Sequence, residues 1–221
     1  MRYSRQIPIV GEEGQRRLAG ARVFVAGAGG LGSNLVLHLS SAGLGHIVVA
    51  DHDVVTESNL NRTFFRVSDL GVPKVEALAR LVGELNPEVE LEPLKMRVEE
   101  VDIGGFDLIF DCLDNVESRL NLESSAADAG LGIVHGGIEG LRGQVAHYHP
   151  SSYRLIRELF TSRSRARNPV LGPTAMLAAS LMALEGILHI SRGRGPLLGK
   201  MLIFDLDTLS FGEVDLPEPE H

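Results

Sequence analysis

A glycine-rich turn is the first stretch of this chain whose residue types and spacing could do chemistry. It fits the pattern G-x-G-x-x-G and consists of Gly27, Ala28, Gly29, Gly30, Leu31 and Gly32. The turn joins an apolar run to a run with leucines at helical spacing, so its glycines would let phosphates approach a helix N-terminus. Asp51 ends a second apolar run about 20 residues later, where its carboxylate can accept hydrogen bonds from ribose hydroxyls. The stretch predicts a nucleotide site, and NAD, FAD and ATP all remain open.

Polar residues suited to phosphate binding follow Asp51. Asp53 comes first, and the run 58–62 (S-N-L-N-R) then places Asn59 and Arg62 three residues apart, on one face of a helical turn. An arginine and an amide there can bind the outer phosphates of a triphosphate. Lys74 begins a predicted helix, where the macrodipole favours anions, so a bound phosphate would account for its ammonium. A solvated surface position is the alternative for Arg62 and for Lys74.

A carboxylate is predicted on the same edge of the sheet. The run D-C-L-D-N at 111–115 lies at the carboxyl end of the fourth predicted parallel strand, where open α/β sheets bind their ligands. Asp114 is therefore placed to hold a magnesium ion, which prefers oxygen ligands, beside the phosphates. The alternative is that Asp114 caps the next helix. Cys112 is expected to pack as a small hydrophobic residue rather than to react.

Alternating strand and helix patterns must position these residues. Apolar or alternating runs predict strands at 22–26, 46–50, 89–94, 107–111 and 133–135. Helical patterns fall at 12–19, 30–42, 73–85 and 115–129, with Pro73 as a first helical residue. This order predicts an α/β fold, a Rossmann-like, doubly wound and mostly parallel sheet with helices on both faces.

The pattern changes after residue 142 and predicts a C-terminal antiparallel extension. Strands are expected at 144–149, 201–205 and 209–214, and an arginine-rich segment, 151–172, is expected to be exposed and mobile. The run 175–190 reads as a helix that is apolar all round, which must be buried in a domain or in a subunit interface. We expect one domain over 1–221, with an N-terminal arm and helix (1–20), a nucleotide-binding core (21–142) and this C-terminal part (143–221).

Composition and charge argue against several kinds of partner and cofactor. The 221 residues carry a formal charge of −8, which argues against a nucleic-acid partner. One cysteine excludes an intrachain disulfide and a cysteine-built zinc site. No uninterrupted apolar run reaches the roughly 18 residues of a membrane span, and no signal peptide is recognisable, so we expect no membrane partner and a cytoplasmic protein.

Six motifs occur in the order and spacing of one known family. They are R-Y-S-R-Q at 2–6, G-A-G-G-L-G at 27–32, D-H-D at 51–53, S-N-L-N-R at 58–62, G-V-P-K at 71–74 and D-C-L-D-N at 111–115. Through them, and through the G-P-T-A-M helix and the F-D-L-D strand, nearly the whole chain resembles the ThiF/MoeB/HesA family. These are the bacterial relatives of ubiquitin-activating enzymes. The glycine turn alone is a weak signal, whereas the combination is highly specific.

The resemblance implies adenylation. ATP and Mg²⁺ would activate the C-terminal glycine of a small ubiquitin-like sulfur-carrier protein ending in Gly-Gly, as in thiamine or molybdopterin pathways, and pyrophosphate would leave an acyl-adenylate. By the same resemblance, the glycine turn packs against the nucleotide, and Asp51, with Asp53 beside it, holds the ribose. The phosphates would be neutralised by Asn59, Arg62 and Lys74, and the magnesium ion would be bound by Asp114. Arg5 would reach in from the other subunit of a homodimer.

Two departures from the family pattern limit the expected chemistry. The position of the first zinc-binding C-x-x-C reads S-Y-R-L at 152–155, and the tail 215–221 has no cysteine, so structural zinc is not expected. The loop 162–169 also lacks the cysteine that would form a thioester or persulfide with the carrier. The chemistry is therefore expected to stop at the adenylate, which an external sulfur donor would attack.

Three other functions remain open at this stage. A relative with the same core could adenylylate a small molecule or a tRNA base. An NAD-dependent oxidoreductase is disfavoured by Arg62, Lys74 and Asp114 around one turn and by the lack of a separate substrate domain. A non-catalytic nucleotide-binding scaffold is the third possibility, which the full set of expected contact residues makes less attractive.

Overall fold

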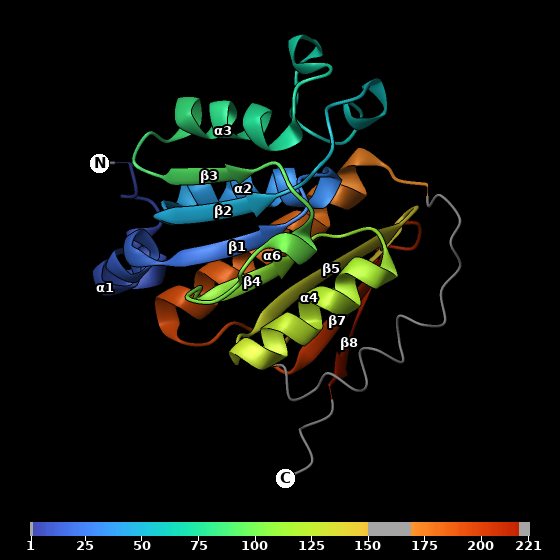
Figure 1. Ribbon diagram of the computed structural model, residues 1–221. Helices are drawn as coiled ribbons and strands as arrows, with labels where there is room; N and C mark the ends of the chain where they lie inside the picture. Colours follow the sequence, from blue (N-terminus) through green and yellow to red (C-terminus); the bar gives the residue numbers. More distant parts are fainter. Residues whose placement is uncertain (1, 150–168, 217–221) are drawn as a thin grey trace.

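An eight-stranded sheet forms the centre of the computed structural model, which describes residues 2–149 and 169–216 (Figure 1). Its strands are β1 (Arg22–Ala26), β2 (His46–Ala50), β3 (Glu90–Leu94), β4 (Leu108–Asp111), β5 (Ile133–Glu139), β6 (Arg142–Tyr148), β7 (Lys200–Asp205) and β8 (Ser210–Asp215). Their spatial order is β3-β2-β1-β4-β5-β6-β7-β8. The strands from β3 to β5 pair in parallel, and β6, β7 and β8 continue the sheet antiparallel. The predicted fold class is confirmed.

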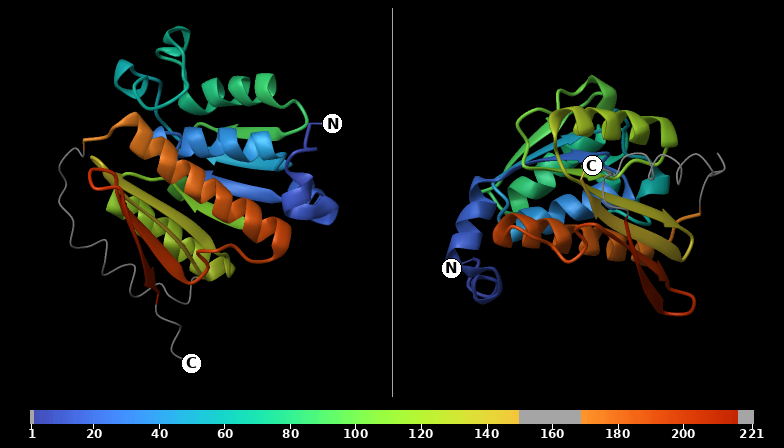
Figure 2. Two further views of the ribbon diagram at one scale, coloured as in Figure 1. Left: turned by 180° about the vertical axis from the view of Figure 1, so that it is seen from behind. Right: turned by 90° about the horizontal axis from the view of Figure 1, so that it is seen from below.

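Helices cover both faces of the sheet, as expected, but unequally. They are α1 (Ile7–Gly20), α2 (Gly30–Ala42), α3 (Lys74–Leu85), α4 (Val116–Ala129) and α6 (Gly172–Arg192). Side chains of α2, α3 and α6 share one hydrophobic cluster with one face of the sheet, whereas α4 packs on the opposite face (Figure 2). Short 3-10 turns at Glu57–Asn59, Val67–Asp69 and Val98–Glu100 connect these elements.

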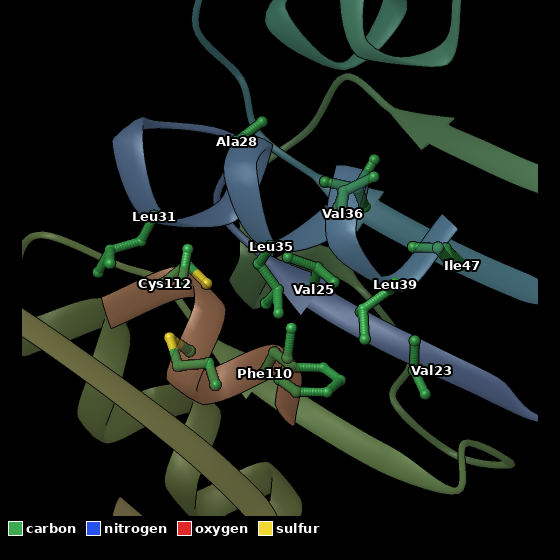
Figure 3. Packing of buried hydrophobic residues seen from close by; sticks show 14 of the residues in the cluster. Val23, Val25, Ala28, Leu31, Leu35, Val36, Leu39, Ile47, Phe110 and Cys112 are labelled. Atoms are coloured by element: carbon green, nitrogen blue, oxygen red, sulfur yellow. The ribbon is translucent and has the colours of Figure 1, made fainter. Parts of the chain in front are cut away.

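The helix that follows the glycine turn is fixed against the sheet by its leucines. Leu35 and Leu39 of α2 are fully buried and lie over Val23 and Val25 of β1, with Phe110 of β4 beside them (Figure 3). Burial of each such side chain contributes about 1.5–3 kcal/mol. This packing holds the start of α2 at the carboxyl end of β1.

Helix α6 is 21 residues long, and only one of its faces is buried. Ala178, Ala179 and Met182 are buried against α2 and the sheet, whereas Leu184 on the outer face is 48% exposed. The sequence predicted burial in a domain or in a subunit interface, and within this protomer only the inner face of the helix is buried. The helix is long and apolar enough to cross a membrane, but half of its most apolar window is buried inside the protein, as in a core helix.

Element ends differ from the sequence predictions by a few residues. Pro73 is the residue before α3, not its first helical residue, and β4 begins at Leu108, one residue later than expected. Strand β5 runs to Glu139 instead of ending at residue 135. Helix α1 starts at Ile7, and it contains a kink at Gly11 where the φ angle is +80°. The arginine-rich segment falls largely outside the described residues.

Candidate functional site

The glycine turn lies at the carboxyl end of β1, between the ends of β2 and β4. At this point the strand order reverses, and such crevices bind ligands in open α/β sheets. Gly27 has a φ angle of +95°, and its N–H donates to the carbonyl of Ala50 at 2.8 Å. A Cβ on Gly32 would overlap the carbonyl oxygen of Gly27, so only glycine allows the turn to fold back on the helix. Leu31 is buried in the first turn of α2.

Asp51 shapes the turn from the neighbouring strand. One oxygen of its carboxylate accepts a hydrogen bond from the N–H of Ala28 at 2.8 Å, and the other accepts from the N–H of Asp53 at 2.8 Å. The side chain is largely buried. Asp51 thus holds the turn and the following loop together. Its expected bond to a ribose would use the remaining lone pairs of the same carboxylate, and that role stays a prediction.

Lys74 lies against the two predicted carboxylates. Its Nζ is 2.7 Å from Asp53 and 3.4 Å from Asp51, and the residue is 7% exposed. The hydrogen bond from Lys74 lowers the pKa of Asp53, although partial burial opposes the shift. The solvated alternative for Lys74 is wrong. This ion pairing was not predicted from the sequence, although two carboxylates spaced two residues apart were a signal for a buried cation.

Arg62 lies across the start of α2. The Arg62 side chain packs on Gly30, since a Cβ on that glycine would lie 3.0 Å from the Arg62 Cδ. The Arg62 guanidinium donates to the carbonyl of Ser58. The Arg62 carbonyl accepts from Asn34 of α2 at 2.9 Å. Asn59 is buried, and its side chain accepts from the N–H of Thr56 at 2.9 Å. The structure thus brings Arg62 to the turn, whereas Asn59 shapes the loop that carries Arg62.

Asp114 lies after β4, the strand beside β1. It is exposed, and within residues 2–149 and 169–216 its carboxylate has no hydrogen-bond or ion-pair partner. The next helix is capped by Asn115, which accepts from the N–H of Ser118 at 2.8 Å. The capping alternative for Asp114 is therefore wrong, and its oxygens remain available. Gly27 and Cys112 are adjacent, since a Cβ on Gly27 would lie 3.1 Å from the Cys112 carbonyl oxygen.

Two acidic groups near the turn could hold a magnesium ion: Asp114, and the group formed by Asp51, His52 and Asp53. Donor atoms of Asp51, His52 and Asp53 lie within 4.8 Å of one another. That group already holds the Lys74 ammonium, whose charge disfavours a cation there. Asp114 fits the hard, oxygen-liganded Mg²⁺ that phosphate sites employ. Burial raises the pKa of the Cys112 thiol well above its usual value, which agrees with a packing role.

Arg5 is the predicted site residue that the structure does not bring to the turn. It lies just before α1, which leads into the amino end of β1, whereas the glycine turn follows the carboxyl end of β1 (Figure 1). Its neighbours fix this place, because Tyr3 donates to Glu88 at 3.0 Å and Gln6 donates to the carbonyl of Ala42 at 2.7 Å. A role of Arg5 at the phosphates stays a prediction.

A second group of functional candidates escaped the sequence analysis. Asp111, at the end of β4, binds His135 of β5, and both are fully buried. Arg119 of α4 approaches both of them. Burial raises the pKa of Asp111, but the Arg119 charge and the His135 hydrogen bond outweigh it and lower that pKa. Only the D-C-L-D-N motif signalled this cluster, because its other members lie far apart in sequence.

The fold and the glycine turn are those of a Rossmann-like nucleotide-binding protein. The chain belongs to the ThiF family, whose pattern matches residues 3–221. It is 35% identical to the SAMP-activating enzyme E1 of Haloferax volcanii, over 96% of this chain and 84% of that protein. It is 32% identical to the molybdopterin-synthase adenylyltransferase of Salmonella typhimurium, over 98% of this chain and 92% of that protein. The predicted family and enzyme class, an adenylyltransferase, are confirmed by these relatives.

Solved structures of low identity share the fold. A crystal structure of PaaA superposes with a TM-score of 0.83 at 21% identity, covering 98% of this chain and 82% of that one. The Escherichia coli MccB structure with ATP gives a TM-score of 0.85 at 20% identity, covering 99% and 72%. At these identities the likeness concerns the fold alone. ATP is nevertheless the nucleotide implied for this chain, because an adenylyltransferase takes its adenylyl group from ATP.

Proposed function

We propose that this chain adenylylates the C-terminal carboxylate of a small ubiquitin-like sulfur-carrier protein. Membership of the ThiF family and the adenylyltransferase relatives support the reaction. The structural observation that supports this reaction in the present chain is that Arg62 and Lys74 both lie beside the glycine turn. Two cations beside that turn suit a triphosphate, and a nicotinamide cofactor has no use for them. We further propose that residues 1–221 act as one adenylation unit.

The proposed mechanism needs positioning and charge neutralisation but no general base. A carboxylate oxygen of the carrier attacks the α-phosphorus of ATP, the bond to the β-phosphate oxygen breaks, and pyrophosphate leaves with that electron pair. The attacking group is already ionised, so no proton must be removed. Arg62 and Lys74 would offset the charge that grows on the leaving group. Asp51 and Asp53 would orient the ribose, and Asn59 would hold the loop that carries Arg62.

Asp114 would hold the magnesium ion in this scheme. A bound Mg²⁺ would polarise the phosphate oxygens and neutralise part of their charge. Asp114 suits this task because its carboxylate is exposed and unpaired within the described residues, at the carboxyl end of the strand beside β1. No structural zinc is proposed, since the sequence has one cysteine and that residue is buried.

The names of the relatives guide the choice of acceptor. One is named for activating SAMP and another for adenylylating molybdopterin synthase, so both are named for protein acceptors. We propose a carrier that ends in Gly-Gly, in a sulfur-transfer pathway such as that of molybdopterin or thiamine. The missing loop cysteine supports a reaction that ends at the acyl-adenylate. Transfer of AMP to a small molecule or a tRNA base is the competing outcome of the same test.

We also propose that the active protein is a homodimer. Arg5 precedes α1 and the amino end of β1, whereas the glycine turn follows the carboxyl end of the same strand. The outer face of α6, with Leu184 48% exposed, and the neighbouring Ile9 of α1, 63% exposed, offer apolar surface for a second copy. A two-fold contact would bury this surface and bring each Arg5 toward the partner's site.

Nucleotide-dependent stabilisation tests the proposal first. ATP with Mg²⁺ should raise the melting temperature, because a ligand at a hundredfold excess over its Kd stabilises the folded state by about 2.7 kcal/mol. NAD should cause no shift. Pyrophosphate exchange into ATP should then require a carrier with a free C-terminal Gly-Gly. A larger shift with NAD, or exchange driven by a small molecule in place of the carrier, would refute the proposed reaction.

A further inference from the structure

The turn that carries Asp114 rests on a set of buried polar side chains. These are Asp111 of β4, Arg119 of α4, His135 of β5 and Gln144 of β6, which we call the histidine network. Asp111 and His135 are fully buried, and Arg119 and Gln144 are 8% and 9% exposed. The reaction proposed above uses none of them, yet burying so many polar groups is costly unless they make specific contacts.

The network holds residue 113 from two sides. One carboxylate oxygen of Asp111 accepts a hydrogen bond from the N–H of Leu113 at 3.0 Å. The guanidinium of Arg119 donates to the carbonyl of Leu113, its Nε at 3.0 Å, and also to the carbonyl of Gly136 at 3.0 Å. The backbone immediately before Asp114 is therefore tied to β4, β5 and α4 at once.

His135 connects the two residues that make these ties. Its Nδ1 is 2.7 Å from the second oxygen of Asp111, and the Arg119 Nη1 lies 2.9 Å from Nδ1 and 3.1 Å from Nε2. An ionised carboxylate only accepts, so the hydrogen bond to Asp111 places a proton on Nδ1. The Gln144 side-chain amide also reaches Nε2, at 3.1 Å. His135 thus lies in contact with the Asp111 anion and with the Arg119 cation.

We propose that His135 is a positioning residue for Asp114. By fixing Asp111 and Arg119, it holds the 112–115 backbone in the one arrangement that presents the Asp114 carboxylate to the metal and phosphates. Residues that orient a metal ligand typically change metal affinity 10–100-fold when they are replaced. The inference rests on the proposed function only for the identity of the ligand, because the ordering of the turn can be measured without any nucleotide.

A second buried histidine gives a matched control. His147 of β6 binds Glu185 of α6 at 2.6 Å, and both residues are almost fully buried. This histidine–carboxylate pair resembles His135 and Asp111 in chemistry and distance. It lies on the opposite face of the sheet, because His147 pairs with Val134, the residue next to His135, and binds a carboxylate of α6, whereas His135 lies against Arg119 of α4. Replacing His147 should therefore destabilise the protein to a similar degree without reaching Asp114.

The experiment compares three replacements at position 135 with His147→Ala. Amide hydrogen exchange of residues 112–115 is measured on the free protein, and AMPCPP binding is measured by calorimetry at increasing Mg²⁺. His135→Ala should speed exchange in this turn and raise the half-saturating Mg²⁺ at least about tenfold. His135→Asn, whose amide N–H takes nearly the place of Nδ1–H, should restore both in large part. His147→Ala should lower the melting temperature but change neither.

The outcomes separate this inference from the proposed function. If wild-type protein binds no AMPCPP with Mg²⁺, the proposed function fails, while faster exchange in His135→Ala would still support the ordering of the turn. If wild type binds and His135→Ala matches His147→Ala in both readouts, the positioning role is wrong. Should His135→Ala not fold, His135→Gln, which keeps volume but moves the amide one bond farther out, is expected to behave as the Ala variant would.

Discussion

At the scale of single residues, the site is defined by how its charges are paired. Lys74 touches Asp53 and Asp51, Arg62 lies over Gly30, and Asp114 has no partner within the described chain. Residue type and spacing were enough to single out each of these positions from the sequence. What they could not reveal is which contacts are already made in the free protein, since Lys74 and Asp53 are distant in sequence.

The first prediction concerns Lys74. Lys74→Ala should reduce pyrophosphate exchange by about 10²-fold or more, because phosphate charge is left uncompensated. Lys95→Ala is the control, since this exposed lysine follows β3 at the same edge of the sheet. Its effect should stay within about twofold, as expected of a screened surface charge. Equal losses of exchange activity in both variants, measured on folded protein, would mean that Lys74 acts only through the overall electrostatic field of the protein.

Glu123 predicts a pH dependence of stability. Burial raises its pKa to about 7, and the Asp111 charge adds to the shift, while the Tyr148 hydrogen bond and the Arg119 charge oppose it. The folded protein then binds a proton that the unfolded chain releases near pH 4.5. The protonated Glu123 therefore contributes to the free energy of unfolding below about pH 4.5. This contribution, up to about 3 kcal/mol, is lost as the pH rises to about 7.

Glu123→Gln should remove this dependence, because the amide does not titrate and can still accept from Tyr148. Urea unfolding of the wild type and the variant at pH 5 and pH 8 measures the effect. The variant should gain stability relative to wild type at pH 8. A constant difference between the two proteins across this range would show that the carboxyl titrates normally.

At the scale of elements, some positions of the glycine turn require glycine, whereas others have room for a side chain. A Cβ on Gly32 would overlap the Gly27 carbonyl, whereas nothing lies within 4 Å of a Cβ on Gly29. Gly32→Ala should therefore cost about 1–3 kcal/mol of stability, as overpacking does, and weaken ATP binding. Gly29→Ala should be close to wild type in melting temperature. Similar melting temperatures for the two variants would contradict the close approach of α2 to the turn.

Element types were predictable because the patterns were strong, whereas ends and exposed faces were not. Leu31, Leu35 and Leu39 repeat at helical spacing and lie buried in α2. The start of α4 could not be decided from sequence, since Asp114 and Asn115 both suit a cap and only the fold selects Asn115. For α6, composition revealed an apolar helix but not that Leu184 faces outward. Periodicity reports local preference, while these details depend on tertiary packing.

At the scale of the whole molecule, Arg5 precedes the amino end of β1 and the glycine turn follows its carboxyl end. We therefore expect Arg5→Ala and Asp114→Ala to be inactive separately. Mixing the two under subunit exchange should restore activity in about a quarter of the sites, those that combine an intact Arg5 with an intact Asp114. Sedimentation and exchange assays on the mixture measure this. A monomer, or confirmed heterodimers without recovery, would exclude the shared site.

The pairing of Lys74 has a consequence for the order in which ligands arrive. Around the turn, the cations Arg62 and Lys74 face the carboxylates Asp51, Asp53 and Asp114, so anionic groups outnumber cationic ones. We therefore expect a free nucleotide polyanion to be attracted more weakly to this site than a nucleotide that already carries a divalent cation, which meets an unpaired carboxylate. The resting protein would thus discriminate against bare ATP at the encounter itself, before any bond is formed, and admit the triphosphate together with its metal.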